Sequence, residues 1–206
     1  IRDICPSRGL GDVYKRQIMS SDGIIVTNFH VIKNAVQIKI LLHDGRESPA
    51  EIIDWDREID LAILKVNLDD LKPISLGNPD NVKVGDIVLA IGNPKGIGQA
   101  VTQGIISAVG INGLRLNSLE NFIQTDAAIN EGSSGGALID IYGNLLGINT
   151  LSLNGNGASG IGFAIPVDEV KKVTSDIIEY GRVIRGWLGI GADMVLLTKK
   201  KSDEIG

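Results

Sequence analysis

The chain has 206 residues, of which 43% are hydrophobic and 22% are charged, and its net charge is −5. This balance is typical of a folded globular protein and excludes a disordered chain, and the lack of a basic stripe excludes nucleic acid as the main partner. No apolar run approaches the roughly 18 residues that a transmembrane helix needs, and the single cysteine excludes an internal disulfide and a cysteine-based metal site.

Residues 1–17 differ from the rest of the chain because they show no hydrophobic periodicity. Residues 12–17 also resemble the translation of a sequencing adapter. We therefore expect residues 1–17 to be an assembly artefact or a disordered segment, and we leave them out of the fold prediction.

The following part of the chain is predicted to form short strands, because brief apolar or alternating runs lie between clusters of Gly, Pro, Asn and Asp. The Pro- and Gly-rich stretch 72–84 divides these strands into two groups. A bulge is expected at Gly104, inside a long predicted strand. The first group comprises residues 24–27, 36–42, 50–55 and 61–66, and the second comprises residues 87–91, 100–109, 122–125, 137–140, 145–150 and 161–165.

After Pro166 the hydrophobic period changes from that of strands to that of a helix. Val173 and Ile177 stand at helical spacing. Proline suits a first helical turn, and Gly181 is a typical stop signal. The sequence therefore predicts a helix over residues 167–181 whose apolar stripe packs on the second group of strands.

Two serines lie among three glycines in the run Gly132–Gly136, between two predicted strands. Glycine allows backbone turns that other residues avoid, so this turn can point a serine hydroxyl outward and gather backbone N–H groups into one small space. Those donors are what an oxyanion hole needs. Because Gly/Ser runs are most often plain turns, the interpretation depends on whether the chain supplies a base and an acid.

A serine nucleophile needs a histidine as its base and an acid to orient that histidine. The chain has two histidines: His30 follows an apolar strand, and His43 stands in the hairpin turn His43-Asp44-Gly45. Asp60, which precedes the strand 61–66, is a candidate acid. Asp126 lies closer to the serines in sequence and is a second candidate.

The order of these residues along the chain separates two kinds of serine hydrolase. The run Gly132–Gly136 also fits the nucleophile elbow of α/β hydrolases, but their histidine follows the serine and none follows Ser134 here. The order His30, Asp60, Ser134 belongs to chymotrypsin-like double barrels. The glycine-rich loop 92–98 lacks the Gly-Lys-Ser/Thr sequence of a phosphate-binding loop, and two distant histidines give no zinc-ligand spacing.

Five segments of the sequence carry a family resemblance, in colinear order from about Ile18 to about Ala192: residues 27–32, 60–66, 124–130, 132–138 and 160–166. They resemble the HtrA serine proteases, and the DegS- and DegP-like members in particular. The resemblance implies an all-β, chymotrypsin-like fold of two six-stranded antiparallel β-barrels with a C-terminal helix, the first barrel incomplete at its N-terminus.

The same resemblance implies a division of the chain into domains. A trypsin-like serine protease domain would cover residues 18–184, with the first barrel at 18–71, the second barrel at 84–166 and the helix at 167–181. Residues 185–206 would be the start of a truncated PDZ domain.

The resemblance also assigns roles to single residues. His30, Asp60 and Ser134 would form the catalytic triad. The N–H groups of Gly132, Ser133 and Ser134 would line the oxyanion hole. No cofactor and no metal are implied.

Asp60, and not Asp126, is thus the implied triad acid, and we expect Asp126 to cap or brace the serine loop. A substrate pocket for a small aliphatic P1 side chain is implied, with walls from Ile129, Ile148, Thr150 and Leu151.

The implied function is a serine endopeptidase that cleaves unfolded or regulatory proteins, including membrane-protein-derived peptides, in the envelope stress response. The full-length protein would be a homotrimer in the bacterial periplasm, anchored to the inner membrane through an N-terminal segment missing here. A catalytically weak, chaperone-like HtrA domain that binds proteins is the alternative. Two departures from the family keep it open: Ser133 replaces the usual Asn, and Glu131 lies in the oxyanion loop.

A third departure concerns activation. Ile111 stands where DegP and DegS relatives carry an arginine that relays the activation signal. The allosteric coupling of those relatives is therefore not carried over to this chain.

Overall fold

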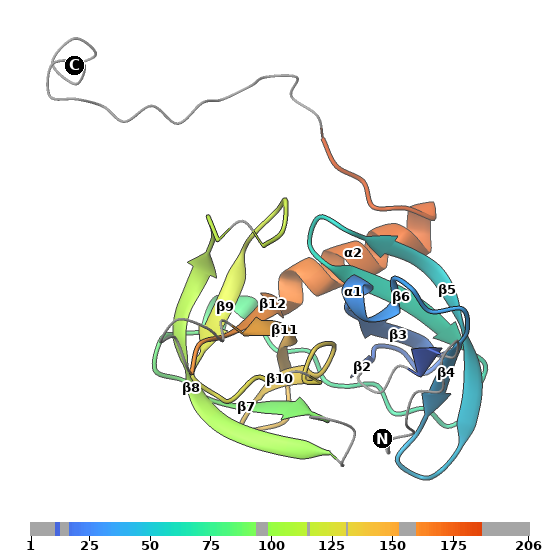
Figure 1. Ribbon diagram of the computed structural model, residues 1–206, viewed down its shortest axis with the longest axis horizontal. Coiled ribbons are helices and arrows are strands. Elements are labelled where there is room, and N and C mark those ends of the chain that lie inside the picture. The colour runs from blue at the N-terminus through green and yellow to red at the C-terminus, as the bar shows by residue number, and fades with distance from the viewer. Residues whose placement is uncertain are drawn as a thin grey trace, which may run out of the picture.

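The computed structural model describes residues 11–12, 17–93, 99–114, 116–130, 132–152 and 160–186. Two β-structures lie side by side, and the helix α2 (Val167–Tyr180) runs along both of them (Figure 1). This mostly β architecture with a C-terminal helix confirms the fold class that the resemblance implies, with a closed barrel in the second half and an open six-stranded sheet in place of the incomplete first barrel.

The N-terminal half is a six-stranded sheet with the strand order β1-β4-β5-β6-β3-β2. Neighbouring strands are antiparallel, except that β1 runs parallel to β4. The strands are β1 (Gly11–Asp12), β2 (Gln17–Ile18), β3 (Ile24–Thr27), β4 (Ile38–Leu41), β5 (Glu47–Asp56) and β6 (Leu61–Val66).

Two short pieces of the N-terminal stretch take part in this sheet. Strand β1 pairs with the start of β4, and β2 pairs with Ile25 and Val26 of β3. The outer edge of β3 is therefore partly covered by Gln17, the last residue of the stretch 1–17, and by Ile18. The rest of that stretch, residues 1–10 and 13–16, lies outside the described residues.

The second half closes into a six-stranded barrel with the order β10-β11-β12-β9-β8-β7. The bulge predicted at Gly104 is wrong, because the register of β8 shifts after Ile106 and again after Ala108. Gly104 instead lets β8 pass close to Ala127, whose backbone nitrogen would lie 2.2 Å from a Cβ atom at position 104. The strands are β7 (Ile87–Gly92), β8 (Ala100–Ile111), β9 (Phe122–Thr125), β10 (Ala137–Asp140), β11 (Leu145–Ser152) and β12 (Gly162–Pro166).

Two short helical segments interrupt the strands. The helix α1 (Phe29–Ile32) carries His30, where the sequence pattern indicated only the end of an apolar strand run. The 3-10 helix η1 (Pro79–Asn81) lies in the connection between the two β-structures. Neither is long enough to show a helical repeat in the sequence, since one turn takes about 3.6 residues.

The C-terminal helix α2 contacts both halves of the molecule. Its apolar stripe, which includes Val170, Val173 and Ile177, is buried. The helix packs on β11 and β12 of the barrel, as predicted, and also on β5 and β6 of the N-terminal sheet. It ends at Gly181, whose φ of +70° is left-handed and whose N–H donates to Ile177 O at 2.9 Å. Within the described residues, no helix combines the length and the apolar character needed to cross a membrane.

The buried side chains form three clusters. One fills the N-terminal sheet around Ile40 and Leu64, and one fills the barrel around Ile106 and Leu138. The third joins the two halves under α2, where Leu61 packs in the same cluster as residues of the barrel and the helix. This shared core holds the two halves in one fixed arrangement, which a site built from both requires.

Candidate active site

His30 and Asp60 meet in the N-terminal half. The Nδ1 atom of His30 lies 2.6 Å from Oδ2 of Asp60, and the backbone N–H of His30 donates to Oδ1 of the same carboxylate at 2.8 Å. An ionised carboxylate can only accept a hydrogen bond, so Nδ1 carries the hydrogen that it donates to Asp60, and Nε2 is left as the basic nitrogen of the ring. The side chain of His30 is 42% exposed, so this nitrogen is within reach of an incoming ligand.

Asp60 is held by its backbone as well as by its side chain. It ends the turn between β5 and β6 with a φ of +64°, a conformation that non-glycine residues seldom adopt. Its carbonyl oxygen accepts from Asn28 Nδ2 at 3.0 Å and from the N–H of Phe29 at 3.2 Å. These bonds tie Asp60 to the segment that carries His30.

Thr150 of β11 connects this pair to the second barrel. Its Oγ1 donates to Oδ2 of Asp60 at 2.9 Å, and its carbonyl oxygen accepts from Oγ of Ser134 at 2.8 Å. The three predicted triad residues therefore meet around Thr150. Among the described residues, Ser134 makes no hydrogen bond with His30, so its hydroxyl points to the carbonyl and not to the base.

The turn before Ser134 has the shape that its glycines allow. Gly132 has a φ of +95°, and the N–H of Ser133 donates to the carbonyl oxygen of Asn130 at 2.8 Å. A φ in this positive range favours glycine, which adopts it without a steric penalty. The N–H of Ser133 is occupied, whereas those of Gly132 and Ser134 have no acceptor among the described residues. Glu131 lies outside the described residues.

Asn149 braces this turn, a role that the sequence analysis missed. Its backbone exchanges hydrogen bonds with Gly135 and Gly136, and its Nδ2 donates to Ala137 O at 3.0 Å and Ile91 O at 3.2 Å. A signal was present in the sequence, because Asn149 and Thr150 interrupt an apolar strand. Buried polar side chains in a strand are almost always hydrogen-bonded, so such a pair indicates a specific local structure.

Ser133 faces away from the site. Only 5% of it is exposed, and its Oγ would lie 2.5 Å from a Cβ atom at position 92, where glycine stands. The side chain therefore packs under β7, while the half-buried Ser134 faces the pair of His30 and Asp60 through Thr150.

The residues expected around the substrate pocket occupy different environments. Ile129 is buried against Gly162, where an added Cβ would lie 2.7 Å from Ile129 Cδ1. Ile148 is fully buried in the core between the two halves. Leu151 is only partly buried and pairs with Phe163 next to a register shift of β11.

The remaining candidates lie elsewhere. His43 stands in the turn after β4. Oδ1 of Asp126 accepts from the N–H of Ile105 at 2.7 Å, so this carboxylate braces β8 and not the serine loop. In the part of the chain that the structure describes, no group of His, Cys, Asp and Glu side chains could hold a metal ion.

Comparison with known proteins agrees with this geometry. The family of trypsin-like peptidase domains matches residues 17–148. The chain belongs to the family of trypsin-like peptidase domains. DegP of Salmonella typhimurium, a periplasmic serine endoprotease, is 50% identical over 175 residues, which cover 84% of this chain and 37% of DegP. DegQ of Escherichia coli, a periplasmic pH-dependent serine endoprotease, is 47% identical over 192 residues, which cover 92% of this chain and 42% of DegQ.

Solved structures give the same result. The HtrA-type protease AlgW with a decapeptide superimposes with a TM-score of 0.84 at 52% identity, covering 93% of this chain and 58% of that chain. The serine endoprotease from Yersinia pestis gives a TM-score of 0.75 at 49% identity, covering 85% and 61%. These matches confirm the resemblance and the fold, and the chain spans about two fifths of the curated relatives' length.

Proposed function

We propose that this domain is a serine endopeptidase in which Ser134 is the nucleophile, His30 the base and Asp60 the orienting acid. The observation that carries the proposal is the 2.6 Å contact between His30 Nδ1 and Asp60 Oδ2, joined to Ser134 through Thr150. Serine, histidine and aspartate in this arrangement perform acyl transfer on unrelated folds, so the geometry and not the fold supports the chemistry.

The reaction begins with rotation of the Ser134 side chain from Thr150 O toward Nε2 of His30. Catalytic hydrogen bonds are often absent until substrate binds. Ser134 Oγ then attacks the scissile carbonyl carbon while Nε2 takes its proton. When the C–N bond breaks, the same proton passes to the leaving amine, and a water molecule later hydrolyses the acyl-enzyme.

The developing oxyanion would be bound by the N–H groups of Gly132 and Ser134. Both lack an acceptor among the described residues, whereas the N–H of Ser133 already donates to Asn130 O. We therefore favour two donors over the three that the resemblance implied. One such donor is typically worth about 2.7–4 kcal/mol of transition-state stabilisation.

The substrates would be unfolded proteins or peptides with a small aliphatic P1 side chain. Solved AlgW structures hold a tripeptide or a decapeptide, which supports peptide substrates here as well. The names of the relatives support a periplasmic location. The envelope stress role, the homotrimer, the inner-membrane anchor and the PDZ domain stay predictions.

The test is hydrolysis of labelled casein by the protein, by Ser134→Ala and by His30→Ala. Both substitutions should abolish cleavage, because each removes an atom that the reaction uses. His43→Ala is the matched control and should retain cleavage within about twofold, since surface substitutions usually have small effects. Loss of cleavage in His43→Ala with retention in His30→Ala would contradict the assignment.

One observation favours the alternative of a binding domain with little hydrolysis. The Ser134 hydroxyl is engaged by Thr150 O and makes no bond with His30. If that state persists with substrate bound, the protein should retain unfolded casein without cleaving it. Co-sedimentation with unfolded casein, compared between the protein and Ser134→Ala, separates the two functions: an endopeptidase degrades casein and only the variant retains it intact.

A further inference from the structure

The turn between β5 and β6 positions Asp60, the candidate acid. It covers residues 57–60 and ends at Asp60, which has the uncommon φ of +64°. A non-glycine residue keeps such a conformation only when its surroundings hold it there. The contacts that restrain this turn therefore also determine where the Asp60 carboxylate lies relative to His30.

Arg185, in the segment after α2, binds two carboxylates of this region. Its Nη2 pairs with Oδ2 of Asp56, the last residue of β5, and its Nη1 lies 2.7 Å from Oε2 of Glu58. The side chain of Asp56 is 1% exposed, so its charge requires a partner. The other oxygen of Asp56 accepts from the N–H of Glu58 at 2.9 Å. The guanidinium thus connects Asp56, the residue before the turn, with Glu58, the second residue of the turn.

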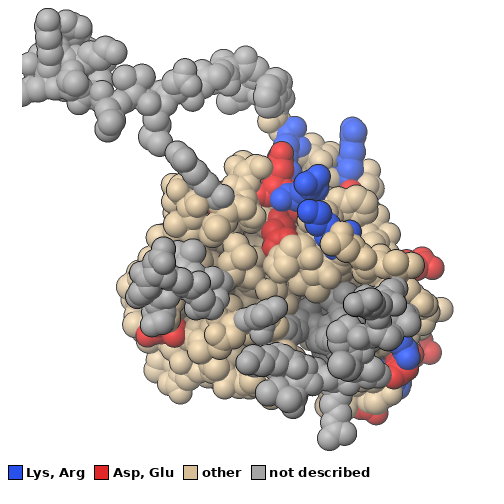
Figure 2. All heavy atoms as spheres, in the orientation of Figure 1, with Lys and Arg blue, Asp and Glu red and all other residues tan. Residues whose placement is uncertain are grey.

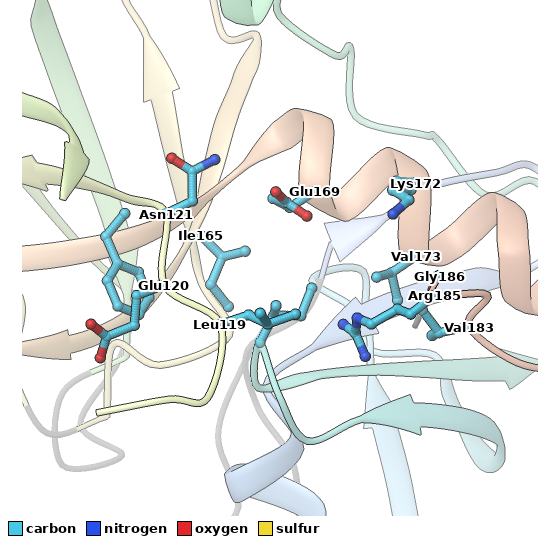
Figure 3. A pocket seen from close by; sticks show the side chains of 12 residues that line it. Leu119, Glu120, Asn121, Ile165, Glu169, Lys172, Val173, Val183, Arg185 and Gly186 are labelled. Carbon is cyan, nitrogen blue, oxygen red and sulfur yellow. The ribbon is translucent and has the colours of Figure 1, made fainter. Parts of the chain in front are cut away.

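The opposite side of the turn contacts the second barrel. The N–H of Leu119 donates to Glu58 O at 3.0 Å, and Ile59 is buried in the shared core with Val173. A cavity of about 420 Å³ lies between these elements. Figure 3 shows Arg185 and Val183 on one side of this cavity and Leu119 facing them.

Within the part of the chain that the structure describes, no second cation could take over the ion pairs of Arg185 with Asp56 and Glu58. Among the described residues Arg185 is the only cation paired with Asp56 or Glu58. Lys172 lines the same cavity without an ion pair in the described part of the chain, and Arg57 lies over the ring of Phe29 instead. Charged groups of both signs also gather on the face shown in Figure 2, with no continuous basic band.

We infer that Arg185 is a positioning residue for catalysis: by binding Asp56 and Glu58 it holds the turn that places Asp60 against His30. This inference rests on the proposed function, because it names a residue on which the same triad depends. Arg185 touches neither the nucleophile nor the base. It acts across 129 positions of sequence, from the point where the chain leaves α2.

The first experiment compares Arg185→Gln with Arg182→Gln. Arg182 lies in the same exposed segment and has no ion pair among the described residues, so it is the matched control. For Arg185→Gln we expect kcat on labelled casein to fall about 10- to 100-fold with KM within about twofold, the size of effect that small errors in catalytic geometry produce. Arg182→Gln should change neither. Equal kcat in the two variants would overturn the inference.

A double variant separates positioning from folding. Arg185→Gln leaves the buried Asp56 carboxylate unpaired, and adding Asp56→Asn removes that charge. We expect the melting temperature to return toward the native value while kcat remains low, because Glu58 still has no anchor. If kcat returns together with the melting temperature, Arg185 is merely structural. Arg185→Lys keeps the positive charge but cannot bind Asp56 and Glu58 with two separate nitrogens, so it should give an intermediate kcat.

A spectroscopic measurement makes the test independent of hydrolysis. His30 is one of two histidines, so its ring nitrogens can be assigned by ¹⁵N NMR with the help of His43→Ala. In the unsubstituted protein at alkaline pH, His30 should carry its proton on Nδ1. Arg185→Gln should shift it toward a mixture of tautomers. An unchanged tautomer overturns the inference, whereas absent casein cleavage by the unsubstituted protein would instead overturn the proposed function.

Discussion

The hydroxyl of Ser134 donates a 2.8 Å hydrogen bond to the carbonyl oxygen of Thr150. Through its own hydroxyl, Thr150 donates at 2.9 Å to Asp60, which belongs to the other half of the molecule. One residue of β11 thereby contacts the proposed nucleophile and the proposed acid together. Thr150 therefore fixes the position of Ser134, in the barrel, relative to Asp60, in the N-terminal half.

Replacing Thr150 by valine should lower kcat on casein about tenfold and reduce stability. The substitution keeps the side chain's shape and the carbonyl oxygen but removes the bond to a buried carboxylate, and bonds to charged groups are worth about 1.5–3 kcal/mol. Thr150→Ser keeps the donor and should stay within about threefold of the native rate. Steady-state kinetics and urea unfolding check both, and a fully active Thr150→Val would show that Asp60 does not need this donor.

A fluorophosphonate probe should label Ser134 and not Ser133. Ser134 is half-buried and is linked to Asp60 through Thr150, whereas Ser133 is 5% exposed and packs beside Gly92. Labelling should therefore disappear in Ser134→Ala and persist in Ser133→Ala. Mass spectrometry of the labelled peptide identifies the modified serine. The opposite pattern would transfer the nucleophile to Ser133.

Replacing Gly162 by alanine should destabilise the barrel, because the added methyl group would clash with the side chain of Ile129. A Cβ at position 162 would lie 2.7 Å from Ile129 Cδ1, and forced overpacking typically costs about 1–3 kcal/mol. The double variant Gly162→Ala with Ile129→Ala should recover part of that loss, because the smaller side chain makes room. Thermal unfolding of the two single variants and the double variant gives the coupling. Simple additivity would show that the two residues do not share this space.

The turn between β10 and β11 should make stability depend on acid pH. Burial raises the pKa of the Asp140 carboxyl, but bonds from the Asn144 side chain and from the N–H groups of Asn144 and Tyr142 outweigh it, so its pKa lies below the usual 3.8. A lowered folded-state pKa stabilises the protein above the unfolded pKa. That stabilisation is lost as the pH falls through the folded value.

Asp140→Asn, which resembles the protonated residue, should therefore be less stable than the native protein at pH 7 by up to about 1 kcal/mol, because solvent screens the bonds of this partly exposed carboxyl. The difference should shrink as the pH falls below about 4. Urea unfolding at the two pH values measures it. Asp69→Asn, at an exposed site whose side chain makes no hydrogen bond in the described part of the chain, should show no such convergence. A constant difference for Asp140→Asn would contradict the prediction.

Much of the candidate site follows from local sequence. The glycines around Ser134, the order of His30, Asp60 and Ser134, and the spacing of apolar residues in α2 are all properties of short segments or of their order along the chain. Turn chemistry, strand alternation and helical spacing act within a few residues. For this reason the strand positions of the barrel, the helix and its stop at Gly181 could be predicted from the sequence.

Other features arise only when distant segments meet. The short helix that carries His30 has too few residues to show a period, and the bulges of β8 depend on how β9 pairs beside it. The bond from Thr150 to Asp60 joins residues 90 positions apart, and the one from Arg185 to Asp56 joins residues 129 positions apart. Such contacts depend on the packing of two halves around a shared core, and no local pattern encodes their geometry. The sequence by itself determined which groups can perform the chemistry, and the tertiary structure decided which residues hold them in place.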